Sequence, residues 1–372
     1  MKKILFTATV DRHILSFHIP YIKWFKEQGY EVHVASNGES KIPFADKKHN
    51  IPFQRSPYSS KNISAYTNLK KIIEENNFSI IHCNTPMGGV VTRLAARKVR
   101  GKETKVIYTA HGFHFFKGAP FFNWIIYYPI EKWLSKYTDC LITINEEDYK
   151  RCINNNFKAK SIKIVNGVGI DLNKFQTATL VEKAELRRAY GYSDNDFILV
   201  YPAELNYNKH QDLLISAVNI LKNRIPKMKL LLAGVGELKE QYEEQVRKLG
   251  LEESVEFLGF RTDMANLLKL SDIAVSASRR EGLPVNIMEA MATGLPIVLT
   301  NCRGNRDLVS NGENGYIVGT KDVEGFADKI EKLYKSEMLR EKFAKKSIDL
   351  SEKYSIEKVL CEIKNIYLSY LK

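Results

Sequence analysis

Strand-like and helix-like runs alternate along almost the whole chain, and this alternation restricts the fold more than any other feature. Short runs rich in Val, Ile, Leu and aromatic residues are followed by longer stretches with helical periodicity. Such a pattern is typical of parallel sheets whose faces are covered by helices. The 372 residues fit two domains of ordinary size. The sequence therefore predicts an α/β protein with two doubly wound, Rossmann-like domains.

Six strands are expected in each half of the chain. Those of the first half are Ile4–Thr9, Glu31–Ala35, Ile80–Cys83, Val106–Ala110, Cys140–Ile144 and Lys163–Val165. Those of the second half are Ile198–Tyr201, Lys229–Ala233, Val255–Leu258, Ile273–Ser276, Ile297–Leu299 and Tyr316–Val318. Helices are expected at Ile14–Gln28, Val90–Arg100, Val323–Lys335, Arg340–Leu350 and Ile356–Leu371. The stretch 171–179 has little periodicity and is the expected linker.

Positive charge is concentrated in the first half of the chain. Residues 1–175 hold 27 Lys and Arg against 14 Asp and Glu, whereas residues 176–372 hold 29 of each. This asymmetry suggests that the first half meets an anionic surface or substrate. The basic residues are scattered and form no recognised nucleic-acid module, so nucleic acid is not the expected partner. Lysine-rich composition by itself is the plain alternative.

Cysteine usage and the start of the chain indicate a cytoplasmic protein. The five cysteines show no C-x-x-C and no zinc-type spacing, which favours small core residues of a reducing compartment. The first apolar run is too short for a signal peptide.

Glu281 and Glu289 lie eight positions apart around Gly282 and Pro284, directly after the strand-like run 273–278. This order predicts a strand, a tight loop and a helix whose first backbone N–H groups can hold a diphosphate. Pro284 suits the first helical turn, which leaves Glu281 in the loop and Glu289 on the helix. On one helix the two acids would be about 12 Å apart, too far for a glycosidase pair. The two carboxylates are better suited to hydrogen bonds with the hydroxyls of a nucleotide-sugar.

The segment resembles the E-x7-E signature of family 4 glycosyltransferases, and Ala-Met-Ala-Thr-Gly-Leu-Pro-Ile-Val (290–298) follows it directly. An ordinary amphipathic helix with surface acids is the alternative. The resemblance implies a GT-B fold, in which two Rossmann-like domains face a central cleft. It implies an acceptor domain over residues 1–172 and a donor domain over 173–355. The helix in residues 356–372 would cross back to the first domain.

The resemblance also implies roles for residues of the second domain. Lys209 would neutralise the donor diphosphate, Glu281 would contact sugar hydroxyls, and Glu289 would accept from the ribose hydroxyls. Further donor contacts are expected from Gly282, Leu283, Pro284, Val285, Asn206, Phe260 and Arg261. Lys209 could also be a solvated lysine at a helix start. No metal ion or other cofactor is expected.

One position departs from the family pattern. Where relatives usually have an arginine five positions before the lysine, this chain has Glu204. Arg279, Arg280, Arg303 or Arg306 are candidates for the missing positive charge. Gly234 and Gly236 follow a strand, but the third glycine of the dinucleotide fingerprint is missing.

His111 ends a strand of the first domain and resembles the family histidine that lies against the donor sugar. A buried structural histidine is the plain alternative, and His111 with His114 is weak evidence for a metal site. Lys209, Glu281 and His111 are the expected catalytic residues. Acceptor contacts are expected from Asp11, Arg12, His13, Arg303 and Arg306.

Gly118–Ile130 is a stretch of thirteen residues without a charge. It is shorter than the roughly 20 apolar residues that cross a bilayer, and its aromatic residues suit a membrane interface or a lipid groove. Lys117, Lys132 and Lys136 could bind an anionic leaflet. A buried helix packing on the sheet is the alternative.

The expected protein is a retaining glycosyltransferase of bacterial capsule or exopolysaccharide assembly. It would move a sugar from a UDP-sugar to a polyprenyl-diphosphate-linked acceptor, working peripherally on the inner face of the cell membrane. Two alternatives stay open: a nucleotide-sugar 2-epimerase on the same fold, and a non-catalytic module that binds a nucleotide-sugar or glycan.

Overall fold

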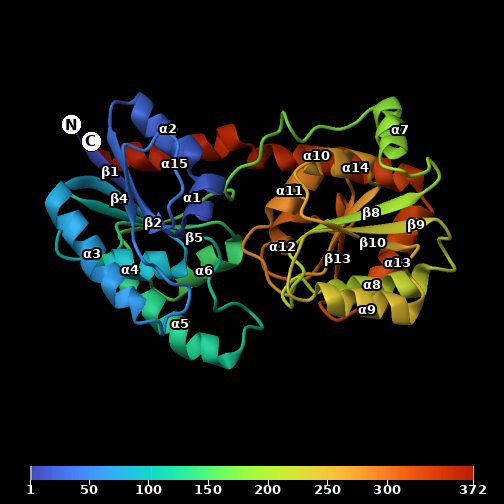
Figure 1. Cartoon of the computed structure of the whole chain (residues 1–372), viewed down its shortest axis with the longest axis horizontal. Coiled ribbons are helices and arrows are strands. Elements are labelled where there is room, and N and C mark those ends of the chain that lie inside the picture. Colours follow the sequence, from blue (N-terminus) through green and yellow to red (C-terminus); the bar gives the residue numbers. More distant parts are fainter. Residues whose placement is uncertain (1, 102, 372) are drawn as a thin grey trace. The chain divides into compact units, whose positions relative to one another are not determined.

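The computed structural model describes residues 2–101 and 103–371, which form two compact units (Figure 1). Unit 1 combines the chain up to Val168 with the residues from Glu357 onward, and unit 2 runs from Gly169 to Ile356. The domain boundaries expected after residues 172 and 355 lie close to these positions.

Unit 1 is built on a seven-stranded sheet with the order β3-β2-β1-β4-β5-β6-β7, in which every pair is parallel. Its strands are β1 (Lys3–Val10), β2 (Glu31–Asn37), β3 (Lys47–Asn50), β4 (Phe78–Asn84), β5 (Lys105–Ala110), β6 (Cys140–Thr143) and β7 (Ser161–Ile164). The order reverses between β1 and β4, which is the point where such sheets bind ligands.

Helices cover both faces of this sheet (Figure 1). They are α1 (Asp11–Phe17), α2 (Ile19–Glu27), α3 (Lys61–Asn76), α4 (Pro86–Ala96), α5 (Phe121–Leu134), α6 (Glu146–Asn154) and α15 (Ile356–Leu371), with a short 3-10 turn at Ser135–Tyr137. One core packs α3 and α4 on the sheet through buried side chains such as Leu69, Ile73 and Val91. The middle strands are apolar on both sides because both faces are covered.

The helix α15 completes the opposite face of unit 1. Tyr367 is fully buried there, and its hydroxyl bonds to His82 Nδ1 at 2.6 Å. Its ring also packs against Phe6 and Phe25. The last helix of the chain is therefore an integral part of the N-terminal unit.

Unit 2 has a six-stranded parallel sheet with the order β10-β9-β8-β11-β12-β13. Its strands are β8 (Phe197–Pro202), β9 (Met228–Ala233), β10 (Val255–Gly259), β11 (Ile273–Ser276), β12 (Ile297–Thr300) and β13 (Gly315–Val318). Its helices are α7 (Leu180–Ala189), α8 (Gln211–Leu221), α9 (Lys239–Leu249), α10 (Met264–Leu270), α11 (Val285–Ala292), α12 (Asn305–Leu308), α13 (Val323–Tyr334) and α14 (Glu337–Ser351), with a 3-10 turn at Glu352–Tyr354. All twelve predicted strands are present, with ends that differ by a few residues.

One local prediction was wrong, and one strand was missed. The expected single helix Ile14–Gln28 is two helices that meet at His18, because Pro20 lacks an N–H group and its ring clashes with the carbonyl four residues earlier. Strand β3 was not predicted, since Lys-Lys-His-Asn has no apolar alternation. It is an edge strand, where lysines are common because they discourage pairing with another chain.

Among the described residues, no helix combines the length and the apolar character that a membrane crossing requires.

Candidate active site

The candidate active site of unit 2 lies at the carboxyl ends of β8 and β11. These strands are neighbours, and the strand order reverses between them. The loop after β8 carries Lys209, and the loop after β11 carries Glu281. The fold therefore brings together two predicted residues that are 72 positions apart in the sequence.

Lys209 and Glu281 form a partly buried ion pair, with 2.5 Å between Nζ and Oε1. Ser278 donates a second hydrogen bond to the same carboxylate oxygen at 2.6 Å. Burial disfavours the ammonium, but the Glu281 carboxylate outweighs it and holds the pKa of Lys209 above its ordinary value. Lys209 is therefore a fixed positive charge near neutral pH, and Glu281 is held in one orientation.

Tyr201 supports this pair, and sequence reasoning missed it. Its hydroxyl, at the end of β8, donates to the carbonyl of Lys209 at 3.0 Å and lies 2.8 Å from Ser278 Oγ. Burial raises the pKa of Tyr201 to about 12, so the phenol keeps its proton. In the sequence Tyr201 looks like one more apolar strand residue, and only the neighbouring strand reveals a polar partner for it.

Further contacts join the two loops. Arg279 donates from Nε to the carbonyl of Tyr207 at 3.0 Å and stacks over the Tyr207 ring at 4.2 Å. Asn208 donates to the carbonyl of Arg280 at 3.1 Å and accepts at its own carbonyl from the Arg279 amide at 2.8 Å. Arg279, one of the candidates for the missing positive charge, thus fixes the loops against each other.

Helix α11 begins one residue later than predicted. Pro284 has extended backbone angles and caps the helix, so it is not part of the first turn. No side chain caps this helix start, and the amides of Val285 and Asn286 have no hydrogen-bond partner among the described residues. Asn286 ties the start to β8 by donating to the carbonyl of Pro202 at 2.7 Å. Such a helix start favours an anion.

Glu289 lies on α11 and is half-buried, as the sequence predicted for its place on the helix. Burial raises its pKa from 4.5 to about 7, and the charge of Lys174 opposes this only in part. Within residues 2–101 and 103–371 its carboxylate makes no hydrogen bond. Since a buried carboxylate normally has a donor, a ligand with hydroxyl groups would suit it.

Arg303, another candidate for the missing positive charge, lies against the acidic segment. It is buried, and its Nε donates to the carbonyl of Glu281 at 2.8 Å. The adjacent Gly304 has φ +80°, and a Cβ there would come within 2.6 Å of the Gly282 carbonyl oxygen. The loop of Arg303 therefore packs directly on the acidic segment. Arg306, expected with it on the acceptor side, is exposed and bonds to Asn301.

Other predicted donor residues have local structural partners. Asn206 accepts from the Lys209 amide at 3.1 Å and so shapes the loop before α8. Arg261 forms a two-point ion pair with Asp263, whereas Phe260 leaves 68% of its surface exposed. Gly236 lies against the backbone of Leu205. A Cβ added at Gly236 would come within 2.2 Å of the Leu205 carbonyl oxygen. The Gly-x-Gly pair is therefore a close contact between two loops.

Unit 1 holds a cluster of histidines at its own switch point. His13 and His18 follow β1, and His111 follows β5. Ring centroids are 4.7 Å apart for His13 and His111, and 5.1 Å for His13 and His18. His111 Nε2 lies 3.1 Å from Asn84 Oδ1 at the end of β4. His114 is elsewhere, stacked on Tyr127 at 4.7 Å, so the supposed pair with His111 is not formed.

Burial lowers the pKa of every histidine in this cluster. His13 falls to about 4, and His18 and His111 fall well below their ordinary value, with the neighbouring histidines adding to the effect of burial. His111 is therefore a neutral ring near pH 7. Because Nε2 is engaged by Asn84, Nδ1 is the ring nitrogen left for a further partner.

The other two residues predicted on the acceptor side of unit 1, Asp11 and Arg12, lie in different environments. Asp11 is buried and bonds to Ser36 at 2.6 Å and Lys48 at 3.0 Å, and these partners lower its pKa although burial alone would raise it. It thus joins α1 to β2 and β3. Arg12 is exposed beside it.

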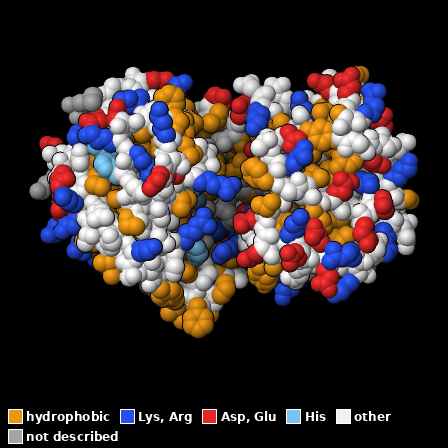
Figure 2. All heavy atoms as spheres, viewed as in Figure 1, with side chains coloured by type: hydrophobic (Ala, Val, Ile, Leu, Met, Phe, Trp, Pro, Cys, Tyr) orange, Lys and Arg blue, Asp and Glu red, His pale blue; other side chains and the backbone are white. Residues whose placement is uncertain are grey.

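The uncharged segment Gly118–Ile130 provides most of α5, and its two faces differ. Trp124 and Tyr128 pack on the core of unit 1. Phe121, Phe122 and Ile125 are exposed, by 74%, 72% and 53% respectively. Figure 2 shows the hydrophobic side chains gathered at the lower edge of unit 1, where Figure 1 places α5. One face of α5 therefore packs on the core, as the buried-helix alternative expected, and the other face is exposed.

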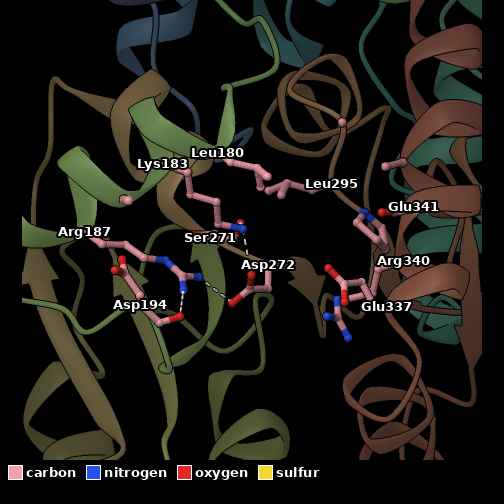
Figure 3. A pocket seen from close by; sticks show the side chains of 14 residues that line it. Leu180, Lys183, Arg187, Asp194, Ser271, Asp272, Leu295, Glu337, Arg340 and Glu341 are labelled. Carbon is pink, nitrogen blue, oxygen red and sulfur yellow. Dashed lines mark hydrogen bonds and ion pairs between the residues drawn. The ribbon is translucent and has the colours of Figure 1, made fainter.

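A pocket of about 440 Å³ lies in unit 2 at the amino ends of β11 and β12 (Figure 3). This end of the sheet is opposite to the carboxyl ends that carry Lys209 and Glu281. Two cations of the pocket are already bound: Lys183 and Arg187 each lie 2.7 Å from Asp272. Asp272 also accepts from the amide of Ile198 at 2.8 Å. We interpret this network as a structural tie between α7 and the sheet.

Known families match both halves of the chain. Residues 3–145 match the model described as glycosyl transferase 4-like, and residues 182–349 match glycosyl transferases group 1. Over 370 residues the chain is 46% identical to EpsD of Bacillus subtilis (strain 168), which is named as a glycosyltransferase, with 100% of this chain and 97% of that protein covered. The chain belongs to the family 4 glycosyltransferases.

Two more distant proteins resemble this glycosyltransferase. It is 28% identical over 312 residues to the UDP-Gal:alpha-D-GlcNAc-diphosphoundecaprenol alpha-1,3-galactosyltransferase of Escherichia coli, covering 83% of this chain and 80% of that one. HepE of Anabaena, solved in complex with UDP-glucose, has a TM-score of 0.81 at 20% identity, covering 99% of this chain and 100% of that one. This likeness confirms the GT-B fold class predicted from the sequence.

Proposed function

We propose that this glycosyltransferase moves a sugar, with retention of anomeric configuration, from a UDP-sugar to a polyprenyl-diphosphate-linked acceptor in polysaccharide assembly. The observation that carries the proposal is the Lys209–Glu281 pair beside the uncapped start of α11. Both lie at the switch point of unit 2, where a fixed cation and free amides suit a diphosphate.

The donor would be held at three points. Lys209 would bind the diphosphate and stabilise the charge that develops when UDP leaves, which requires no proton transfer. The free carboxylate of Glu289 would accept from the ribose hydroxyls, and Glu281 would contact hydroxyls of the sugar. Because Lys209 and Ser278 already occupy one oxygen of Glu281, this carboxylate suits a positioning task better than nucleophilic attack.

We assign His111 to the hydroxyls of the transferred sugar. Its neutral state agrees with that task, because a neutral ring whose Nε2–H donates to Asn84 keeps a lone pair on Nδ1 that can accept from a sugar hydroxyl. The acceptor proton would leave with the departing phosphate, so His111 need not act as a base. Its partner Asn84 would fix which nitrogen carries the proton.

The acceptor assignment is supported by the similarity to the galactosyltransferase of Escherichia coli, whose name includes a diphosphoundecaprenol acceptor. It is also supported by the exposed aromatic face of α5, near which Lys136 lies 4.7 Å from the Trp133 ring. We propose that this face enters the interfacial region of an anionic membrane, where exposed aromatic side chains and lysines both contribute.

A transfer assay tests the proposed function. The protein would be incubated with a panel of UDP-sugars and an undecaprenyl-diphosphate-linked sugar, and the products would be analysed by mass and by anomeric proton coupling. We expect one UDP-sugar to give a lipid-linked disaccharide with retained configuration. Conversion of a UDP-sugar without an acceptor would instead identify a 2-epimerase. Binding of UDP-sugars without any conversion would identify a non-catalytic module.

The membrane part of the proposal has a matched control. We expect the double variant Phe121→Ser/Phe122→Ser to lose binding to vesicles that contain an anionic phospholipid. The control Leu180→Ser/Val181→Ser removes two equally exposed apolar residues from unit 2 and should bind as the unmodified protein does. Binding should also weaken with salt, since screening shortens to about 3 Å at 1 M. Equal binding by both double variants would contradict the assignment of α5.

A further inference from the structure

The histidine cluster of unit 1 has a second chemical capacity besides the one assigned to His111. One ligand atom from each of His13, His18 and His111 lies within 4.8 Å of the other two. The three rings come from two segments that follow β1 and β5, which leave the same edge of the parallel sheet on either side of β4.

Three nitrogen atoms of this cluster are buried without a partner among the described residues. They are Nε2 of His13 and both Nδ1 and Nε2 of His18, whose side chain is 2% exposed. A buried polar atom without a partner costs about 1–3 kcal/mol, so a fold that keeps three together calls for an explanation. Simple packing of aromatic rings does not use these atoms.

We propose that His13, His18 and His111 bind one divalent transition-metal ion of the zinc type. Three neutral imidazoles form a ligand set that zinc accepts, with a fourth position left open for water or another ligand. The absence of a carboxylate from the cluster disfavours magnesium and calcium, which prefer oxygen ligands.

The surroundings fit this assignment. When the Asn84 carbonyl oxygen accepts from His111 Nε2, the lone pair of His111 is on Nδ1, which is the outer-shell arrangement that orients a metal-binding imidazole. Zinc–nitrogen bonds of about 2.0–2.1 Å in a tetrahedral site put the nitrogens about 3.4 Å apart, so the ligand atoms, now within 4.8 Å of one another, must approach by up to about 1.4 Å.

Occupation of this site would have a consequence for catalysis, which rests on the proposed role of His111. A metal-bound His111 cannot orient sugar hydroxyls through the nitrogen that holds the ion. We therefore infer that zinc acts as a reversible inhibitor of sugar transfer, relieved by a chelator.

The test measures metal binding directly on the full chain, without a nucleotide-sugar. Metal-free protein would be titrated with Zn²⁺ against a chromophoric chelator, and with Co²⁺ while the visible spectrum is recorded. We expect one equivalent to bind, a four-coordinate cobalt spectrum, and no comparable binding of Mg²⁺. No binding at one equivalent, or a six-coordinate cobalt spectrum, would overturn the proposal.

Variants locate the ion. His13→Asn and His18→Asn should each weaken zinc binding by more than about 100-fold, since changes outside the ligand shell already cost 10–100-fold. His49→Asn is the matched control, because His49 also has a histidine neighbour, with His33 Nδ1 at 3.1 Å. Circular dichroism would show whether each variant folds, and His13→Asn decides the matter if His18→Asn does not fold. Unchanged binding in His13→Asn, or equal loss in His49→Asn, would refute the site.

The inhibition is measured separately from the binding. Zinc should lower transfer by the unmodified enzyme, and addition of a chelator should restore it. One equivalent of bound zinc with undiminished transfer would overturn the inhibitory role, and a protein that binds zinc but transfers no sugar would count against the proposed function alone.

Discussion

Replacing Glu289 with glutamine isolates the electrostatic cost of a half-buried carboxylate that has no hydrogen-bond donor among the described residues. Burial raises the pKa of Glu289 from 4.5 to about 7. Each pH unit of difference between the folded and unfolded pKa is worth about 1.4 kcal/mol, so ionised Glu289 destabilises the folded protein by about 3 kcal/mol. Glutamine has nearly the same shape and no charge to bury.

The sign of the effect follows from the raised pKa. Below pH 4.5 the carboxyl group is protonated in both states, and Glu289 imposes no electrostatic cost. As the pH rises through 4.5 and up to about 7, the unfolded chain loses this proton before the folded one, so the relative stability of the native protein falls. Glu289→Gln should therefore be more stable than the unmodified protein at pH 8, by about 3 kcal/mol, and the difference should shrink toward pH 4.

The measurement must follow unit 2, and tryptophan fluorescence does not, because Trp24, Trp124 and Trp133 all lie in unit 1. Hydrogen exchange by mass spectrometry, read on peptides from the buried strands β8 and β11, gives the free energy of opening of unit 2 at each pH. The control Glu185→Gln removes an exposed carboxylate from α7 and should leave the pH profile unchanged.

A pH-independent difference between Glu289→Gln and the unmodified protein would refute the reasoning. So would a loss of stability at pH 8, because it would mean that the carboxylate has stabilising partners that the structure does not show.

Three further outcomes concern the donor site and its partner histidine. UDP binding should release protons near pH 7 in the unmodified protein but not in Glu289→Gln, because hydroxyl donors favour the ionised carboxylate. Calorimetry in buffers of different ionisation enthalpy measures the number of protons released. Equal proton release by the two proteins would contradict the prediction. Lys209→Met should lower kcat by roughly 10²–10³-fold, the usual cost of removing one group that stabilises a leaving charge; a loss below tenfold at saturating donor would count against the assigned role. His111→Ala should lower kcat with little change in the KM for donor, and the reverse pattern in steady-state kinetics would place His111 in ground-state binding.

Most of the fold could be predicted because its information is local. Buried strands of parallel sheets are continuous apolar runs, and each of the predicted runs is a strand. The predictions of secondary structure failed where the position of a segment in the fold, or a single residue, outweighs the pattern of apolar residues. Strand β3 is polar because it is an edge, and the break at His18 depends on a single proline.

Residues of the candidate site could be predicted where a sequence motif contains them. They could not be predicted where only the fold brings them together. Lys209 and Glu281 were expected together, and they form an ion pair. Tyr201 supports that pair from a strand whose sequence carries no signal of its own, whereas Arg303 was expected as a positive charge but not as a donor to the Glu281 carbonyl. The grouping of His13 and His18 with His111 depends on the strand order, in which only β4 separates β1 from β5, and spacing along the chain does not reveal that order.

The position of α15 late in the sequence has a consequence for how unit 1 folds during synthesis. Unit 1 lacks one wall of its core until the ribosome has delivered Tyr367, although most of its residues are synthesised first. Unit 2 has no such dependence, because its residues are contiguous. During translation the earlier half must therefore wait for the later half, and a premature stop in the final helix would damage the lobe that was synthesised first.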